Sequence, residues 1–200
     1  AEVANFNSPD QIVITGEAEK VSKASEAIQA AGARRVIPLD VSGAFHSSLM
    51  RPAVAKFEAE LKKCALRISR FPILSNVDAK PEADPEKIRR NLALQITSSV
   101  QWVDSIRAIA AAGVMTFLEI GPGNVLKGLI RKIDPNLAVH NIRNPQDKPV
   151  RPPERVPLYR REHVGEGPGR RREGEIHRGP EKLECAAGHA AFAAYEGDFR

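Results

Sequence analysis

Apolar and polar positions alternate in blocks along the first 150 residues, and the blocks have the periods of strands and helices. Short apolar runs next to glycine or proline are typical of strands, whereas apolar residues three and four apart are typical of helices. The pattern predicts strands over residues 11–15, 35–41, 71–75, 114–120 and 137–142. It predicts helices over residues 17–31, 47–66, 85–94, 100–112 and 124–133. Strands that alternate with helices indicate an α/β fold with some parallel pairing.

Three segments carry expectations about burial or turns. The apolar stripe of helix 47–66 includes Cys64, so we expect this cysteine to be buried as a small hydrophobic residue. The strand at 114–120 is almost continuously apolar, which is typical of a strand buried on both faces. Residues 5–9, Asn-Phe-Asn-Ser-Pro, are rich in side chains that bond the local backbone and predict a turn.

The composition changes between Pro145 and Pro153, after which glycine, proline and arginine dominate. Such a segment buries too little apolar surface to offset its ordering entropy, so we expect residues 151–200 to be mostly disordered. A reading-frame error and a genuine linker would both explain the change. Cys185 and His189 have a ligand-like spacing, but two groups do not make a metal site, and we expect no metal. Arg170 to Arg172 could contact phosphates, although no neighbouring aromatic residues favour base stacking.

The bulk composition is ordinary for a globular protein, with 42% hydrophobic and 28% charged residues. No apolar run approaches the roughly 18–20 residues that span a bilayer, and no signal peptide is recognisable at the start. Two distant cysteines fit a reducing cytoplasm, which we expect to be the location. The net charge of +5 could serve nucleic acid, an anionic membrane or an acidic protein, but mild basicity is also common among enzymes.

The most informative stretch is residues 41–50, Val-Ser-Gly-Ala-Phe-His-Ser-Ser-Leu-Met. A strand ends, a glycine bends the chain, and His46 precedes a helix. An imidazole on such a rigid support suits proton transfer near neutral pH. Position alone favours a helix-capping or simply exposed histidine instead. Asp40 and Asp78 lie near strand ends and could orient a histidine, although most such carboxylates are solvated.

Gly121-Pro-Gly-Asn124 follows a predicted strand and opens a helix, so its amides could receive an anion. A tight turn that needs glycine conformations is the simpler interpretation. A Gly-x-Ser-x-Gly nucleophile motif is absent from the sequence.

Five ordered stretches carry a resemblance to a known family. They are ANFNSPDQIVITG at 4–16, VSGAFHSSLMRPA at 41–53, ILSNVDA at 73–79, QITSSVQW at 95–102 and FLEIGPGNVLKGLIRKI at 117–133. Together they resemble successive landmarks of malonyl-CoA:acyl-carrier-protein transacylases, over roughly residues 1–147. This resemblance overrides the positional argument against a catalytic His46.

The resemblance implies a ping-pong transfer of malonyl from coenzyme A, through an acyl-serine, to the phosphopantetheine thiol of acyl carrier protein. It implies that His46 is the general base and that the main-chain carbonyl of Gln95 orients its ring. Phe45 matches a position that accompanies selection of malonyl over methylmalonyl. Asn5 and Asn7 match polar positions lining the cleft. No cofactor, nucleic acid or membrane is implied, and the family member is expected to be a monomer when whole.

The fold implied by the resemblance is an incomplete α/β-hydrolase-like large subdomain with part of an inserted ferredoxin-like small subdomain. Residues 1–45 would belong to the small subdomain, residues 46–147 to the large one, and residues 148–200 to a disordered or out-of-frame tail. The family's nucleophile elbow, oxyanion loop and malonate-binding arginine precede the stretch matched by Ala1. We therefore expect this chain alone to be inactive.

Two alternatives remain open at this stage. The chain could be the same module from a polyketide synthase, although Gly43 in Gly-Ala-Phe-His is nearer the stand-alone form of the family. It could also be a non-catalytic protein whose basic surface holds an acidic partner.

Overall fold

A computed structural model of the chain describes residues 1–144, 146–147 and 190–196, the last of these as backbone only. The strands are β1 Glu2–Ser8, β2 Gln11–Glu17, β3 Arg35–Leu39, β4 Ile73–Leu74, β5 Pro81–Glu82, β6 Thr116–Ile120, β7 Ala138–Ile142 and β8 Ala190–Glu196. The helices are α1 Ala18–Ala30, the 3-10 helix η1 Ser48–Met50, α2 Arg51–Lys63, α3 Pro85–Gln95, α4 Trp102–Ala111 and α5 Val125–Ile133. Each predicted element is present, some in shortened form, whereas β1, β5 and β8 were not predicted.

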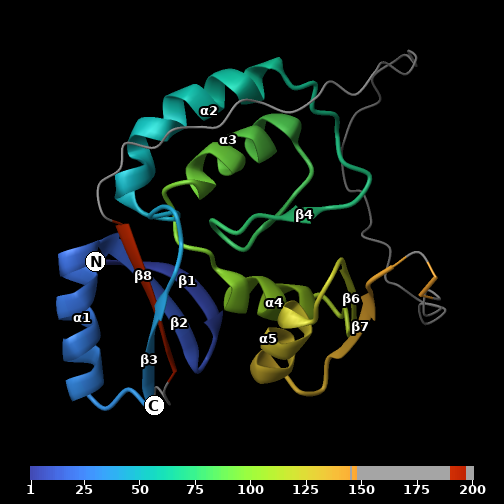
Figure 1. Cartoon of the computed structure of the whole chain (residues 1–200). Coiled ribbons are helices and arrows are strands. Elements are labelled where there is room, and N and C mark those ends of the chain that lie inside the picture. The colour runs from blue at the N-terminus through green and yellow to red at the C-terminus, as the bar shows by residue number, and fades with distance from the viewer. Residues whose placement is uncertain (145, 148–189, 197–200) are drawn as a thin grey trace.

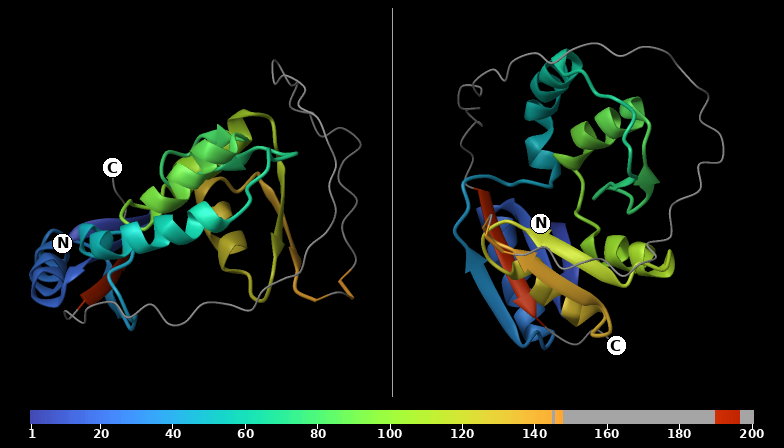
Figure 2. Two further views of the ribbon diagram at one scale, coloured as in Figure 1. Left: turned by 90° about the horizontal axis from the view of Figure 1, so that it is seen from above. Right: turned by 90° about the vertical axis from the view of Figure 1, so that its right-hand side faces the viewer.

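The elements form three groups (Figure 1). A four-stranded antiparallel sheet has the order β1-β2-β8-β3, and α1 packs on it through Val21 and Ile14. Helices α2 and α3 lie side by side next to the short β4–β5 hairpin, as Figure 2 shows from above. Helices α4 and α5 accompany the parallel pair β6–β7. The α/β fold class predicted from the sequence is therefore confirmed. None of the helices in the described ranges has the length and apolar character of a membrane span.

Strand β1 replaces the turn predicted at residues 5–9. It pairs antiparallel with β2 from Glu2 to Ser8, and its alternation buries Ala4 and Ser8. The turn is confined to the two residues that follow, where the Ser8 hydroxyl donates to the Asp10 carboxylate. The prediction was wrong because asparagine's local turn preference is weaker than the ladder and burial that β2 offers.

Strand β8 lies between β2 and β3 and is antiparallel to both (Figure 1). Residues 190–196, which lie in the segment predicted to be mostly disordered, form this strand. The rest of the predicted tail, including Cys185, His189 and the arginines at 170–172, lies outside the described residues.

The core of the third group centres on Ile106 of α4, which is 1% exposed. It packs with Ile130, Leu137 and Val139, which α5 and the start of β7 provide. Helices α4 and α5 each have one apolar side, and this side packs into the core next to the parallel strand pair.

Strand β6 is not buried on both faces, contrary to its near-continuous apolar sequence. Leu118 is 49% exposed and Ile120 is 77% exposed. Among the described strands, β6 pairs with β7 alone. Parallel strands are normally covered on both faces, so a two-stranded pair leaves apolar side chains open.

The predicted burial of Cys64 is also wrong, since this free thiol is exposed. The apolar stripe holds as far as Leu61, which is buried. Helix α2 ends at Lys63, so the helical period no longer determines which way residue 64 points.

We predict that Ile106→Ala lowers the free energy of unfolding by about 2–5 kcal/mol, because it leaves a cavity in a closed core. Urea unfolding of the whole chain measures this. Ile120→Ala makes the same chemical change at a 77% exposed position and is expected to cost less than about 1 kcal/mol. Equal losses in the two variants would contradict this account of the core.

Candidate active site

His46 is held from two sides by the end of α3. Its ring atom Nδ1 lies 2.9 Å from the main-chain oxygen of Gln95. Its own backbone N–H donates to the oxygen of Ile96 at 3.0 Å. The residue has φ of 61°, a left-handed conformation that is uncommon outside glycine. Such a conformation persists only where the surroundings enforce it, and here two hydrogen bonds do so.

The turn that presents His46 is built by its neighbours. The buried Ser47 hydroxyl donates to the Ala44 oxygen at 2.7 Å and accepts from the Leu49 N–H at 3.3 Å. This serine caps η1 and so fixes the point at which the helical segment begins. A Cβ added to Gly43 would lie 3.3 Å from the Phe45 ring, so a glycine keeps this turn tight.

The ring is bonded to a carbonyl at a helix C-terminus, where the last carbonyls receive no hydrogen bond from an N–H of the same helix. Gln95 is the last residue of α3, and Asp84 caps the other end of the helix, where its carboxylate accepts from the Glu86 N–H at 2.8 Å. Because a carbonyl can only accept, the proton of a neutral imidazole must sit on Nδ1. Nε2 is then a free base. Within the described residues, no group hydrogen-bonds to Nε2.

The segment after Gln95 is attached to strand β1. Val100 donates to the Ala4 oxygen at 2.8 Å and accepts from the Phe6 N–H at 2.9 Å. The Ser99 hydroxyl donates to the Val3 oxygen. Ala4 is completely buried. The start of the chain therefore fixes the loop that leads away from the His46 acceptor.

The structure brings together some of the predicted site residues but not all of them. His46 and Gln95 are in direct contact. Phe45 adjoins His46 and is 47% exposed. Asn5 pairs with Val100 in an isolated parallel bridge, and Asn7 lies two residues farther along β1, half-buried. Neither asparagine hydrogen-bonds His46 in the described part of the chain. Asp40 and Asp78 do not orient the ring either, because its acceptor is a carbonyl.

Sequence reasoning missed Glu2 as a part of this region. Its carboxylate accepts from the Ser48 N–H at 3.1 and 3.2 Å and from the Ser48 hydroxyl. An anion at this place stabilises the start of η1, two residues after His46. Glu2 and Ser48 are 46 positions apart in the sequence, so no local pattern could have revealed their contact.

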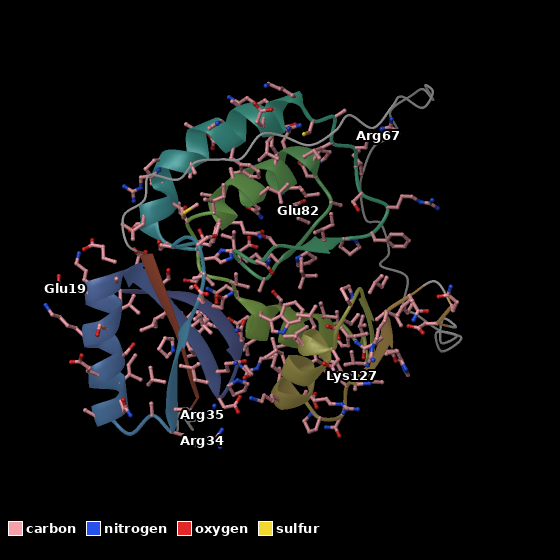
Figure 3. All side chains as sticks on the ribbon, viewed as in Figure 1. Glu19, Arg34, Arg35, Arg67, Glu82 and Lys127 are labelled. Carbon is pink, nitrogen blue, oxygen red and sulfur yellow. The ribbon has the colours of Figure 1, made fainter. Side chains whose placement is uncertain are left out.

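After the turn at Gly121 to Asn124, the amides at the start of α5 bind an anionic group of the chain itself. The Glu119 carboxylate accepts from the Leu126 N–H at 3.0 Å and the Lys127 N–H at 3.1 Å. These amides belong to the first turn of α5, at the end of the helix where Figure 3 labels Lys127. Gly121 and Gly123 have φ of 133° and 93°, so the turn interpretation is confirmed.

Desolvation raises the pKa of Glu119, but the Leu126 and Lys127 amides and the Asn141 side chain outweigh it and hold the pKa below its ordinary value. Asn141 donates to this carboxylate at 2.6 Å. Strand β6, strand β7 and the start of α5 thus meet at one ionised group.

Comparison with known proteins identifies the family. The sequence model of a family described as "Acyl transferase domain" matches residues 2–178. The chain belongs to the acyl transferase domain family. This acyl transferase chain is 43% identical over 145 residues to the malonyl CoA-acyl carrier protein transacylase of Bacillus subtilis (strain 168). It is 43% identical over 141 residues to the enzyme of the same name from Escherichia coli (strain K12).

The match covers 72% of the acyl transferase chain and 46% of the Bacillus subtilis relative, and 70% and 46% in the Escherichia coli comparison. The chain thus spans about half the length of these curated relatives. Among solved structures, the acyl-carrier-protein-S-malonyltransferase of Bartonella henselae is 40% identical with a TM-score of 0.70, covering 72% of this chain and 46% of that one. A malonyl-transacylase in complex with a type II PKS acyl-carrier protein is 42% identical with a TM-score of 0.69, covering 71% and 46%.

We predict that Glu119→Gln destabilises the chain at pH 7 and that its effect fades in acid. A carboxyl with a lowered pKa in the folded state contributes stability above its unfolded pKa, near 4.5. That contribution disappears as the pH falls through the folded pKa. Urea unfolding at pH 7 and pH 3 measures both ends. Glu58→Gln is the control, since it makes the same charge change on an exposed face of α2. A loss at pH 3 as large as at pH 7 would show that packing is responsible, and the charge is not.

Proposed function

We propose that this chain supplies the general base for transfer of malonyl from coenzyme A to the phosphopantetheine thiol of acyl carrier protein. The observation that carries the proposal is the contact of the His46 Nδ1 with the Gln95 oxygen, which leaves Nε2 available. Family membership supports it, because the relatives are malonyl CoA-acyl carrier protein transacylases. A serine, a base and a group that orients the base are the parts such an acyl transfer needs.

In the proposed first half-reaction, Nε2 removes the proton of a serine hydroxyl as its oxygen attacks the malonyl thioester carbonyl. The tetrahedral intermediate collapses, the carbon–sulfur bond breaks, and the imidazolium returns the proton to the coenzyme A thiolate. In the second half, Nε2 takes the proton of the pantetheine thiol, whose sulfur attacks the acyl-serine. The serine oxygen then leaves with that proton. Thioester and thiol are both supplied by the substrates, so the proposed reaction needs no cofactor or metal.

The Gln95 carbonyl does in this proposal what a carboxylate does in a Ser-His-Asp triad. It fixes the tautomer and the orientation of the ring, which becomes an imidazolium during the reaction. A neutral acceptor stabilises that charge less than a carboxylate. The second hydrogen bond, from the His46 amide to the Ile96 oxygen, fixes the backbone that carries the ring.

The serine is the missing partner of this base. No serine hydroxyl among the described residues hydrogen-bonds to Nε2. We propose that the nucleophile comes from the part of the acyl transferase fold that this chain does not match, and that the chain alone does not turn over malonyl-CoA. The exposed apolar residues of β6, Leu118 and Ile120, support this, because the faces of a parallel sheet are normally covered by flanking helices.

Residues 1–45 would form part of a ferredoxin-like small subdomain, for which the antiparallel sheet with one packed helix is suitable support. Asn5 and Asn7 would line the cleft from β1. A cytoplasmic location and a monomeric state of the whole enzyme remain predictions.

A polyketide carrier protein is a second candidate acceptor. It is favoured by one observation, the similarity to a transacylase that is bound to a type II PKS acyl-carrier protein. The transfer chemistry at His46 would be the same in both cases. Comparing transfer rates to carrier proteins of the two pathways distinguishes them.

We predict that His46→Ala reduces malonyl transfer by about 10⁴–10⁶-fold, as loss of the base does in related mechanisms. The measurement uses a chimera in which residues 1–147 replace the matching half of the Bacillus subtilis relative. Gln95→Ala serves for comparison, because it removes the side chain and keeps the main-chain acceptor, so its rate should fall far less. A chimera that keeps most of its activity without the imidazole would exclude His46 as the base.

We predict that Phe45→Ala in the same chimera relaxes selection against methylmalonyl-CoA. The exposed ring adjoins the base and would occupy the space that an α-methyl branch requires. One methyl group in a pocket is worth about 10–200-fold in kcat/KM, which bounds the expected change in the malonyl to methylmalonyl ratio. Phe71→Ala, at another exposed phenylalanine, is the control. An unchanged ratio in Phe45→Ala would remove this residue from substrate selection.

A further inference from the structure

In the four-stranded sheet β1-β2-β8-β3, strands β2 and β3 are separated by the width of one strand, and β8 occupies that space. We refer to this space as the gap between β2 and β3. β2 and β3 both run antiparallel to β8 and so are parallel to each other, with α1 as the connection between them. They do not pair with each other in the sheet. Without a strand in this gap, each would present an unpaired edge to the other. Such edges readily accept an extended peptide through main-chain hydrogen bonds.

The occupant in this structure is the chain's own residues 190–196. They pair with β2 at seven successive positions, from Gln11↔Glu196 to Glu17↔Ala190. On the other side they pair with β3 at five positions, from Arg35↔Glu196 to Leu39↔Phe192. The register is continuous on both sides, as in the interior of a sheet. This strand also lies beyond residue 178, where the match to the acyl transferase domain ends.

We propose that the gap between β2 and β3 is a strand-acceptor site, and that residues 190–196 are a complementing strand that occupies it within the same chain. Forty-two residues, 148–189, connect the strand to the body. At about 3.3 Å per extended residue they reach far across a domain of this size. Closing so long a loop costs little more entropy than closing a loop of half that length.

A chain of contacts connects this site to His46. β8 pairs with β2, β2 pairs with β1, and β1 holds Val100 through the Ala4 oxygen and the Phe6 amide. Val100 lies at the end of the short segment that begins at Gln95, the acceptor of the His46 ring. A strand in the gap converts β2 from an edge strand into an interior one, and so stabilises the sheet from which this segment is held. This inference goes beyond the proposed function and does not depend on transacylase activity.

The test compares two proline substitutions in the whole 200-residue chain. Ala193→Pro removes an N–H from the middle of a strand that is bonded on both sides, so the strand should leave the gap. Ala187→Pro makes the same change three residues before the strand and should have no such effect. Ala193→Val keeps the N–H and is expected to behave as the parent chain.

Two readouts decide the outcome. In the parent chain, amide hydrogen exchange at residues 191–195 should be at least about a hundredfold slower than in a free peptide of that sequence. Ala193→Pro should lose this protection and weaken that of β2. The NMR signal of the His46 Nδ1–H should broaden or disappear in the same variant, and a synthetic peptide of residues 188–198 should restore it.

Exchange of residues 191–195 at the free-peptide rate in the parent chain would overturn the proposal. So would identical behaviour of the two proline variants. Gel filtration gives the remaining distinction: if protection appears only in a dimer, the strand is exchanged between two copies, and occupancy within one chain is wrong.

Discussion

The geometry of the candidate active site depends on the attachment of one residue in a left-handed conformation to the end of one helix. His46 contributes both its ring and its amide to the carbonyls of Gln95 and Ile96. With φ of 61°, the residue would relax toward an extended or helical conformation if these bonds were lost. The contact therefore does two things. It holds the turn after β3, and it determines which ring nitrogen carries the proton.

That attachment is only as rigid as the end of α3, which is supported from the opposite end of the sequence. Strand β1 bonds both the amide and the carbonyl of Val100, and the Glu2 carboxylate accepts from the first amide of the helical segment that follows His46. The base, its acceptor and their supports thus come from three stretches far apart in the chain. A site of this kind forms only when the sheet and the helices have docked, because no one stretch has both the donor and the acceptor.

The same structure explains why this part of an acyl transferase fold can hold the His46 ring in place and still leave apolar side chains of β6 exposed. The buried core around Ile106 is contained within residues that the chain itself provides. The parallel pair β6–β7 is different, since Leu118 and Ile120 remain open to solvent. The matched region makes up 46% of the length of each of these two relatives. Within the described residues, both the exposed apolar side chains of β6 and the His46 Nε2 are open to further contacts.

Local pattern by itself determined the helices and most of the strands, because helix caps, glycine stops and apolar periods act within a few residues. It singled out His46 as a candidate only, and the family resemblance supplied its role and its acceptor Gln95. It placed Cys64 and the strand at 114–120 wrongly, because burial depends on where a helix ends and on which strands cover a sheet. Tertiary structure alone decided the following features: strands β1 and β8, the contact of Glu2 with Ser48, and the contact of the Glu119 carboxylate with α5. Each joins groups that are distant in sequence or have no local signal, and such pairings become favourable only once the chain has folded.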